Sequence, residues 1–250
     1  MKKTYVAAFA ALAIAGSFSS QVFAQQAERQ LIQVNQLVLK PNEAERFRAI
    51  HRDNFMPRGR ASGLPFRITS STVLGQSFEV SVATPIPNFA ALDAGTPLDG
   101  DTVDAQMLRE GWNSAVTSRR SFVVTSRPDM NMAPVPNADY SIVVRFQVKS
   151  GKAPQFEALW KSTIRPALVA SGQKGTSVFQ TLQGGKNGEY FALTPLANMA
   201  ALDGPGPFSS MTPEEGARLT AQVSELLEEY ETNISQTDHE LSYGLPGLNP

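Results

Sequence analysis

His51 is the residue in this chain best suited to acid–base chemistry, and it lies in a segment with the pattern of an amphipathic helix. An imidazole titrates near neutral pH, so His51 could serve as a general base or as an axial ligand to a metal or a haem iron. The other histidine, His239, lies in the C-terminal tail. The sequence has no cysteine, no HxxxH or GxSxG pattern and no cluster of metal ligands. We therefore expect no metal site and no cofactor.

A few other polar and aromatic residues could complete a site around His51. Asn35 could hold a carbonyl group or an oxyanion by hydrogen bonding. Trp112 could stack on a flat ring, and Arg67 could neutralise an anionic group. A plainer interpretation also stands, because a lone helical histidine is often a satisfied core residue and a tryptophan often only fills a core. The candidate site consists of His51 and Asn35 as catalytic residues and Gln33, Asn54, Arg67 and Trp112 as ligand-binding residues.

An internal repeat predicts how these residues are positioned. The phrase FAALDAGTPL, which begins at Phe89, returns as MAALDGPGPF at Met199. Residues 40–63, KPNEAERFRAIHRDNFMPRGRASG, match residues 149–172, KSGKAPQFEALWKSTIRPALVASG. Two matching blocks in the same order and at nearly the same offset indicate a tandem duplication. We place the first unit at residues 25–133 and the second at 134–250, with RPDMNMAPVPNAD as the linker.

Each unit has the pattern strand, helix, strand, strand, helix, strand. The first strands are LIQVNQLVL and YSIVVRFQV, which are rich in β-branched residues and alternate in polarity. Asn42 is suited to cap the first helix of the first unit. Thr102 and Thr212 are suited to cap the second helices, and Asn88 and Asn198 to cap short helical turns. An apolar stripe from Leu219 to Ile234 predicts that the last helix continues through Tyr230. The closing strands are expected near residues 122–126 and 234–239.

A βαββαβ unit forms a four-stranded antiparallel sheet with both helices on one face, which leaves the other face in need of a cover. The second unit can supply that cover. In its element order and its helix–PxxxASG–hairpin–AALD pattern, the chain resembles the dimeric α/β-barrel superfamily, with ferredoxin-like units of the antibiotic-biosynthesis-monooxygenase type. The resemblance implies an α+β fold in which two tandem units pack sheet to sheet within one chain. That superfamily includes cofactor-free oxygenases, isomerases and haem-degrading enzymes, so the fold alone does not select a function.

The two units differ most where the first strand and first helix face each other. Gln33 and Asn35 of the first unit correspond to Ile142 and Val144 of the second, His51 corresponds to Trp160, and Asn54 to Thr163. Burying unpaired polar groups is unfavourable, so the polar set should pair internally, contact water or face a ligand. The resemblance also places pockets between sheet and helices. We therefore predict one pocket, in the first unit.

The composition limits the location and the partners of the protein. Residues 1–24, MKKTYVAAFAALAIAGSFSSQVFA, have the basic start, apolar run and small-residue cleavage pattern of a signal peptide. A periplasmic or secreted mature protein is therefore expected. The full chain has a net charge of −1, which loss of Lys2 and Lys3 makes more negative, so neither nucleic-acid binding nor membrane insertion is expected. Because the duplication already supplies a pseudo-dimer, we expect a monomer.

Three functions fit these observations. The first is a binding protein that holds a small, largely apolar or aromatic molecule in the first unit. The second is a cofactor-independent monooxygenase or isomerase that acts on an aromatic or polyketide-like substrate. The third is a structural protein without a pocket. A haem function would require His51 to reach an open cavity.

Overall fold

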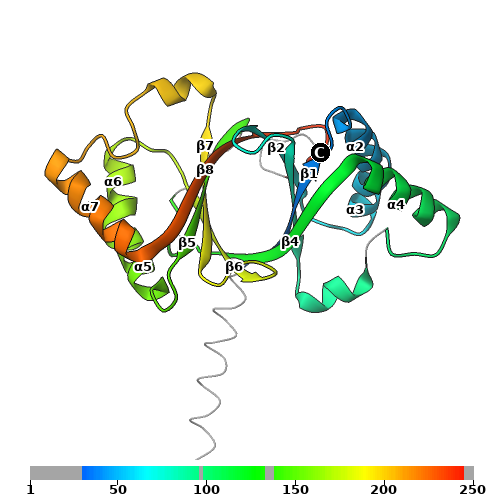
Figure 1. Ribbon diagram of the computed structural model, residues 1–250, viewed down its shortest axis with the longest axis horizontal. Helices are drawn as coiled ribbons and strands as arrows, with labels where there is room; N and C mark the ends of the chain where they lie inside the picture. Colours follow the sequence, from blue (N-terminus) through cyan, green and yellow to red (C-terminus); the bar gives the residue numbers. More distant parts are fainter. Residues whose placement is uncertain (1–29, 96–97, 133–137, 245–250) are drawn as a thin grey trace, which may run out of the picture.

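Eight antiparallel strands close into a barrel within the single chain (Figure 1). The computed structural model describes residues 30–95, 98–132 and 138–244, so the expected signal peptide lies outside the described residues. The order around the barrel is β1-β3-β2-β8-β5-β7-β6-β4. The strands are β1 (Leu31–Leu39), β2 (Ile68–Leu74), β3 (Glu79–Ile86), β4 (Val116–Ser126), β5 (Tyr140–Val148), β6 (Ser177–Gln183), β7 (Glu189–Leu196) and β8 (Leu227–Thr237). The predicted fold of two tandem ferredoxin-like halves is confirmed.

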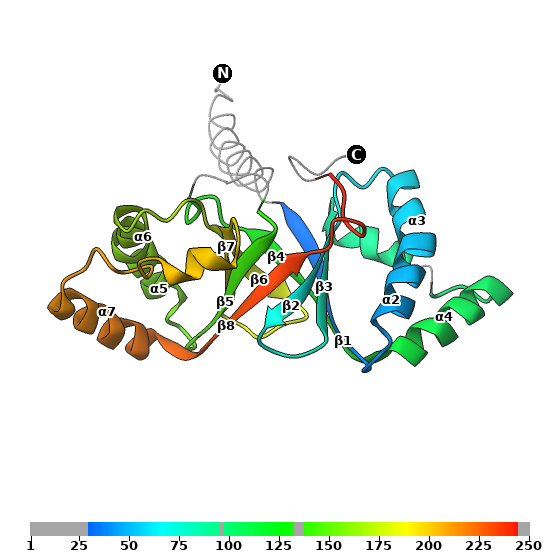
Figure 2. The ribbon, with the colours of Figure 1, turned by 90° about the horizontal axis from the view of Figure 1, so that it is seen from above.

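The helices of each half cover the outside of the barrel on opposite sides (Figures 1 and 2). In the first half, α2 (Ala44–Ile50), the π-helical turn η1 (His51–Phe55) and α3 (Met56–Ala61) follow one another without a break. The second half repeats them as α5 (Ala153–Leu159), η3 (Trp160–Ile164) and α6 (Arg165–Ala170). Each π-helical turn lies just before a proline, Pro57 or Pro166. Because proline lacks an amide hydrogen, the altered turn lets the helix pass a residue that cannot join the regular ladder.

The predicted caps of the second helices and of the short turns are present in both halves, but the predicted Asn42 cap is wrong, since α2 begins after Glu43 and has no side-chain cap. Thr102 accepts a hydrogen bond from the amide of Ala105 at the start of α4 (Val103–Ala115). Thr212 forms a reciprocal capping box with Glu215 at the start of α7 (Pro213–Leu226). Asn88 and Asn198 cap the short 3-10 helices η2 (Phe89–Ala94) and η4 (Met199–Asp203). The repeated AALD phrase is thus a capped turn that follows each hairpin.

The predicted extent of the last helix is wrong. The helix α7 ends at Leu226, and β8 begins at the next residue, so Tyr230 and Ile234 are strand residues. Ile234 is paired with Ile142 of β5, within a ladder that runs along the whole of β5. Its apolar side chain fits a helical stripe and a strand equally well, and pairing with β5 decides between them. The strand β4 likewise begins at Val116, six residues before the predicted start.

Three apolar clusters fill the molecule. One lies between the sheet and helices of the first half and includes Leu37, Phe47 and Trp112. A second, around Phe156 and Trp160, occupies the same place in the second half. The third fills the barrel interior, and its buried members are Ile32, Phe122, Val124 and Phe191. The open sheet faces of the two halves therefore cover each other, as the repeat predicts.

The end of each half crosses over and completes the core of the other half. After β4, residues 127–132 pack against the second half, and Met130 is fully buried in its core. After β8, residues 238–243 pack against the first half, where Leu241 and Tyr243 join the core. Corresponding backbone hydrogen bonds hold the two crossings, from Arg127 to Val178 and from Asp238 to Thr69.

Ion pairs hold both crossing segments to the helices, with the basic residue on the crossing segment in one half and on the helix in the other. In the second half, the crossing residue Arg127 pairs with Glu157 on α5. In the first half, the crossing residues are acidic, and Asp238 and Glu240 pair with Arg48 on α2. Arg48 and Glu157 occupy corresponding positions of the repeat, so the charges are exchanged between helix and crossing segment. None of the helices in the described ranges has the length and apolar character needed to span a membrane.

Candidate functional site

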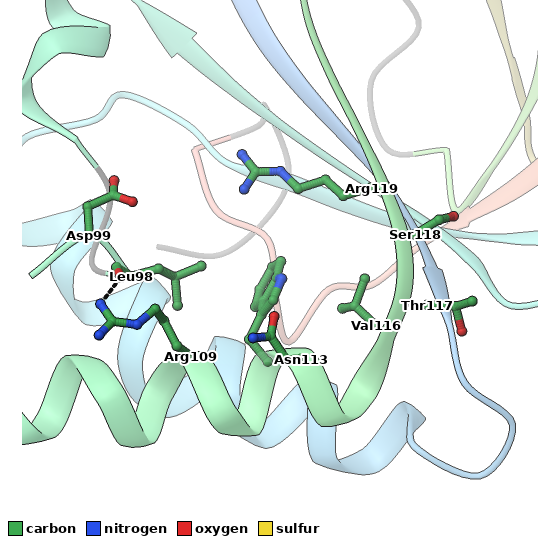
Figure 3. A pocket seen from close by; sticks show the side chains of 9 residues that line it. Leu98, Asp99, Arg109, Asn113, Val116, Thr117, Ser118 and Arg119 are labelled. Atoms are coloured by element: carbon green, nitrogen blue, oxygen red, sulfur yellow. Dashed lines mark hydrogen bonds between the residues drawn. The ribbon is translucent and has the colours of Figure 1, made fainter.

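A cavity of about 330 Å³ lies in the first half, between α4, the start of β4 and the loop before α4 (Figure 3). The helix contributes Arg109, Trp112 and Asn113 to its wall. The strand contributes Val116, Thr117, Ser118 and Arg119, and the loop contributes Leu98 and Asp99. The wall therefore combines one large aromatic ring with two arginines and one aspartate.

Helix periodicity and strand register position these side chains. Leu108, Trp112 and Ala115 recur at helical spacing and form the buried face of α4. The chain passes from α4 directly into β4, which brings the first strand residues beside Trp112. The ladder between β4 and β1 then sets Arg119 opposite Leu37. Since Leu37 belongs to the core under the helices, Arg119 is on the helix-facing side of the sheet.

Arg119 is held in place by a polar anchor on the sheet. Its Nε and Nη2 atoms donate to Oδ1 of Asn35 at 3.2 and 2.9 Å, and Nε also donates to Oγ of Ser121 at 2.8 Å. The hydroxyl of Ser121 donates to the same Asn35 oxygen at 2.6 Å. Figure 3 shows the side chain of Arg119 reaching from β4 towards the side of the cavity where Asp99 lies. The anchor reduces the conformational freedom that a binding arginine would lose.

Arg109 holds the loop before α4 in place at the edge of the cavity. Its Nη1 atom donates to the carbonyl oxygens of Leu98 and Gly100, at 2.7 and 2.6 Å. Figure 3 marks the bond to Leu98. These bonds tie the loop to α4, so this arginine contributes both a structural link and a positive charge to the cavity.

Behind the cavity, Trp112 belongs to a cluster of four aromatic side chains in the first core. Its ring centroid lies 5.2 Å from that of His51, 5.3 Å from that of Phe55 and 5.9 Å from that of Phe47. His51 is the first residue of the π-helical turn η1 and is 1% exposed. Its Nδ1 atom lies 2.6 Å from Nη2 of Arg67, which is also buried.

Burial controls the charges of this pair. Burial, with a further contribution from the Arg67 cation, holds the pKa of His51 well below its usual range. Burial also lowers the pKa of Arg67 to about 10, so Arg67 is still protonated at neutral pH. Because a guanidinium only donates hydrogen bonds, Nδ1 of His51 must accept, which puts the imidazole proton on Nε2. That Nε2 atom is buried and has no partner.

The structure separates the predicted site residues into three groups. Trp112 lines the cavity, with His51 and Arg67 behind it. Asn35 anchors Arg119, and among the hydrogen bonds and ring contacts of the described residues none joins Asn35 to His51. The other two are half-buried. Gln33 lies on the same face of β1 as Asn35, and Asn54 donates to the carbonyl of Ile50 one turn earlier at 3.2 Å.

Sequence reasoning missed Arg119 and Arg109. Arg119 was missed because the closing strand was expected to begin near Phe122, which left residues 116–121 without a face. The run VTSRRSFVV carries a signal of a longer strand, because it combines β-branched residues with alternation around Phe122. Arg109 carries no such signal, because its bonds to the loop depend on how the loop folds back on α4.

The corresponding place in the second half has a different chemistry. The amides that follow α4 and α7 bond to the carbonyls of Trp112 and Val223, which makes these two residues equivalent. The strand ladders in the same way equate Arg119 with Tyr230 and Asn35 with Val144. The aromatic ring, the cation and its anchor are thus all specific to the first half.

A second cavity, of about 250 Å³, opens at one end of the barrel and is lined by residues of both halves. Its wall is strongly charged, with Glu79 and Glu231 facing Arg120 and Arg145. Nearby, the fully buried carboxylate of Glu189 bonds to Arg120 and Arg145. Within the described ranges, no group of three histidine, aspartate or glutamate side chains is placed to hold a metal ion.

No protein-family model matches this chain, and no curated protein matches it. Solved structures do share its fold. A "putative monooxygenase" from Lactobacillus acidophilus NCFM has a TM-score of 0.55 at 13% identity, over 84% of this chain and 94% of the other. An anthrone oxidase-like protein has a TM-score of 0.51 at 11% identity, over 87% and 94%.

A single-residue mutant of chlorite dismutase from Candidatus Nitrospira defluvii has a TM-score of 0.50 at 9% identity, over 88% of this chain and 98% of the other. At these identities the likeness shows the fold. The chain has the dimeric α/β-barrel fold, with both ferredoxin-like halves in one polypeptide.

Proposed function

We propose that this protein binds a small aromatic molecule with an anionic group in the cavity between α4 and β4. The observation that carries the proposal is the pairing of Trp112 with the anchored Arg119 across one cavity of about 330 Å³. A tryptophan offers a flat apolar surface for a ring, and a guanidinium suits a carboxylate or a similar oxyanion. Few convergent polar groups around an aromatic surface are typical of small-molecule sites.

The size of the cavity supports a ligand with one or two rings. A cavity of about 150 Å³ already accommodates benzene. At about 330 Å³, this cavity has room for a ring with substituents or for a second ring.

The geometry favours binding over catalysis by His51. Its Nδ1 atom already accepts a hydrogen bond from Arg67, and its side chain does not line the cavity. A general base must lie within hydrogen-bonding reach of the proton that it removes. A monooxygenase or isomerase is the second candidate, and it is favoured by the fold shared with a protein named as a monooxygenase and with an anthrone oxidase-like protein. That likeness concerns the fold alone.

Thermal-shift screening followed by calorimetry tests the proposal. The panel pairs aromatic carboxylic acids with their neutral amides and adds quinones and haem. We expect an aromatic acid to bind the full chain. The change Arg119→Gln should weaken that acid at least about tenfold, because one charge-assisted hydrogen bond contributes about 1.5–3 kcal/mol. The neutral amide should lose much less.

Arg58→Gln is the matched control, because Arg58 is exposed on α3 and does not line the cavity. It makes the same change of net charge and should leave the affinity unchanged. Equal losses in the two variants would mean that only net charge matters. Absence of binding across the panel would count against the proposal.

We also propose that the protein acts outside the cytoplasm, on the basis of the signal-peptide pattern of residues 1–24. Expression of the full chain in a Gram-negative host, with fractionation and intact-mass measurement, tests this. The expected product is an exported chain that begins at Gln25. An uncleaved cytoplasmic chain would contradict it.

A further inference from the structure

Arg67 is a buried cation without an acidic partner. It is 6% exposed and lies directly before β2. Its backbone bonds in both directions to Tyr243 of the crossing segment, at 3.0 and 2.9 Å. Across the described part of the chain, no aspartate or glutamate pairs with it, and its one side-chain hydrogen bond is to His51. A buried charge without a counter-ion is strongly unfavourable.

The hydrogen bond to His51 leaves part of the guanidinium unpaired. The N–H groups of Nε and Nη2 point the same way and form a fork that fits the two oxygens of a carboxylate. His51 offers a single acceptor, which Nη2 occupies at 2.6 Å. The Nε atom of Arg67 is buried and has no partner. The Nε–Nη2 edge can therefore take two acceptor atoms, and its Nε donor has none.

Two more unpartnered polar atoms belong to the same core. They are Nε2 of His51 and the hydroxyl of Tyr243. In the Arg67-bonded tautomer, Nε2 of His51 carries a hydrogen, and the hydroxyl of Tyr243 can also donate. The buried donors around Arg67 thus lack hydrogen-bond acceptors, and an anion supplies acceptors.

In the second half, the polar groups at the corresponding positions all have hydrogen-bond partners. The backbone hydrogen bond from the amide of Met132 to the carbonyl of Thr176 repeats the one from Tyr243 to Arg67, so the positions correspond. The hydroxyl of Thr176 bonds to Gly175 and Thr194. The indole N–H of Trp160, which corresponds to His51, donates to the carbonyl of Met130 at 2.9 Å. The unpaired donors and the lone charge are therefore particular to the first half.

We propose that the Nε–Nη2 edge of Arg67 is a binding site for a small planar oxyanion of the carboxylate class, distinct from the cavity beside Trp112. One oxygen accepts from Nε, and the second shares or replaces the contact that Nη2 makes with His51. Because the backbone of Arg67 holds Tyr243, the bound anion also stabilises the docking of residues 238–243 on the first half. Arg67 does not line the cavity, so this site goes beyond the proposed function.

The test is an NMR titration of the full chain with sodium formate against sodium chloride at equal ionic strength. The Nε–H signal of Arg67, assigned by its loss in Arg67→Met, should shift with formate and level off. The Nε–H signal of Arg127 is the internal control, because Nε of Arg127 already donates to Asp129 at 3.1 Å, and it should not shift. The thermal midpoint should rise to a plateau with formate in the wild type but not in Arg67→Met.

A formate response that is absent, or equal at Arg67 and Arg127, would overturn the inference, and the wild-type titration gives this answer even if Arg67→Met does not fold. An aromatic acid from the screen forms the second arm. If that acid shifts the Arg67 signal and formate does not, the anion belongs to the cavity ligand and the separate site is wrong. If formate shifts Arg67 while no aromatic acid binds, the proposed function fails and this site stands.

Discussion

His51 and Trp160 occupy corresponding positions at the start of the π-helical turns η1 and η3, but only Trp160 has its ring N–H paired. The indole of Trp160 donates to the carbonyl of Met130, on the segment that crosses from the first half. Nε2 of His51 has no partner, and Nδ1 of the same ring contacts Arg67. The duplication thus keeps the helix geometry in both halves and changes the chemistry in one.

The pair formed by His51 and Arg67 should behave as a coupled unit in stability measurements. The change His51→Phe leaves the buried guanidinium without an acceptor, and we expect it to lower the free energy of unfolding by about 1.5–3 kcal/mol. Adding Arg67→Met should recover most of that loss, because it removes the buried charge. Urea unfolding of the wild type, both single variants and the double variant measures the coupling. Additive effects would contradict the account.

Acid should destabilise the protein through His51 before it affects the ion pairs. The folded-state pKa of His51 is lowered by burial and then by Arg67, so the unfolded chain binds its proton more readily. The stabilisation from neutral His51 is therefore complete above the unfolded pKa of about 6.5 and declines as the pH falls below it, by at most about 1.4 kcal/mol per pH unit.

Urea unfolding at pH 7.5 and pH 5.5 tests this expectation. The depressed carboxylate pKa values of Glu157 and Glu240 concern a lower window, below about pH 4.5. We expect the wild type to lose stability between the two pH values and the His51→Phe/Arg67→Met variant to lose clearly less. Equal losses would show that His51 does not control this range.

The two crossing segments should differ in their sensitivity to loss of an arginine. The side chain of Arg127 is 7% exposed and bonds to Glu157 and Asp129, whereas that of Arg48 is 32% exposed. We expect Arg127→Met to cost about 1.5–3 kcal/mol of unfolding free energy, because it removes charge-assisted hydrogen bonds but leaves the carboxylates of Glu157 and Asp129 part-exposed. Arg48→Met should cost less, although it strands the largely buried carboxylate of Asp238. Thermal unfolding of both variants compares them, and a larger loss in Arg48→Met would contradict the ranking.

The closed barrel predicts a monomer. Each of the eight strands of the barrel has a neighbour on both sides within the chain, so strand pairing leaves no open edge for a second copy. Light scattering coupled to size-exclusion chromatography should give the monomer mass over a wide concentration range. A stable dimer at micromolar concentration would contradict this prediction.

The repeat made much of the fold predictable from sequence, because each strand and helix occurs in two copies whose sequence patterns can be compared. The ranges of β1 and β5 agree with the predicted strands residue for residue, since alternation and β-branching point to the same structure. The caps at Thr102 and Thr212 are local and were equally predictable. The end of the last helix was not, because the pairing of Leu227 and Tyr230 with β5 depends on tertiary contacts that periodicity cannot show.

The candidate site was predictable only in part. Comparing the two copies drew attention to the polar residues of the first half, but none of them lines the cavity, and Trp112, which does, was proposed for its flat ring alone. It could not show that Asn35 anchors Arg119, because that contact depends on the register between β1 and β4. Nor could it show that His51 bonds to Arg67, because the two residues meet only when the hairpin folds back under η1.

The two tryptophans provide the most direct test of the binding proposal, because the chain has one in each half and only Trp112 lines the cavity. Indole N–H signals should be followed by NMR while the tightest-binding aromatic acid of the screening panel is added. The account predicts a saturable shift of the Trp112 signal, with little change at Trp160, whose N–H is already bonded to Met130. An unchanged Trp112 signal at saturation, or equal shifts at both tryptophans, would contradict it.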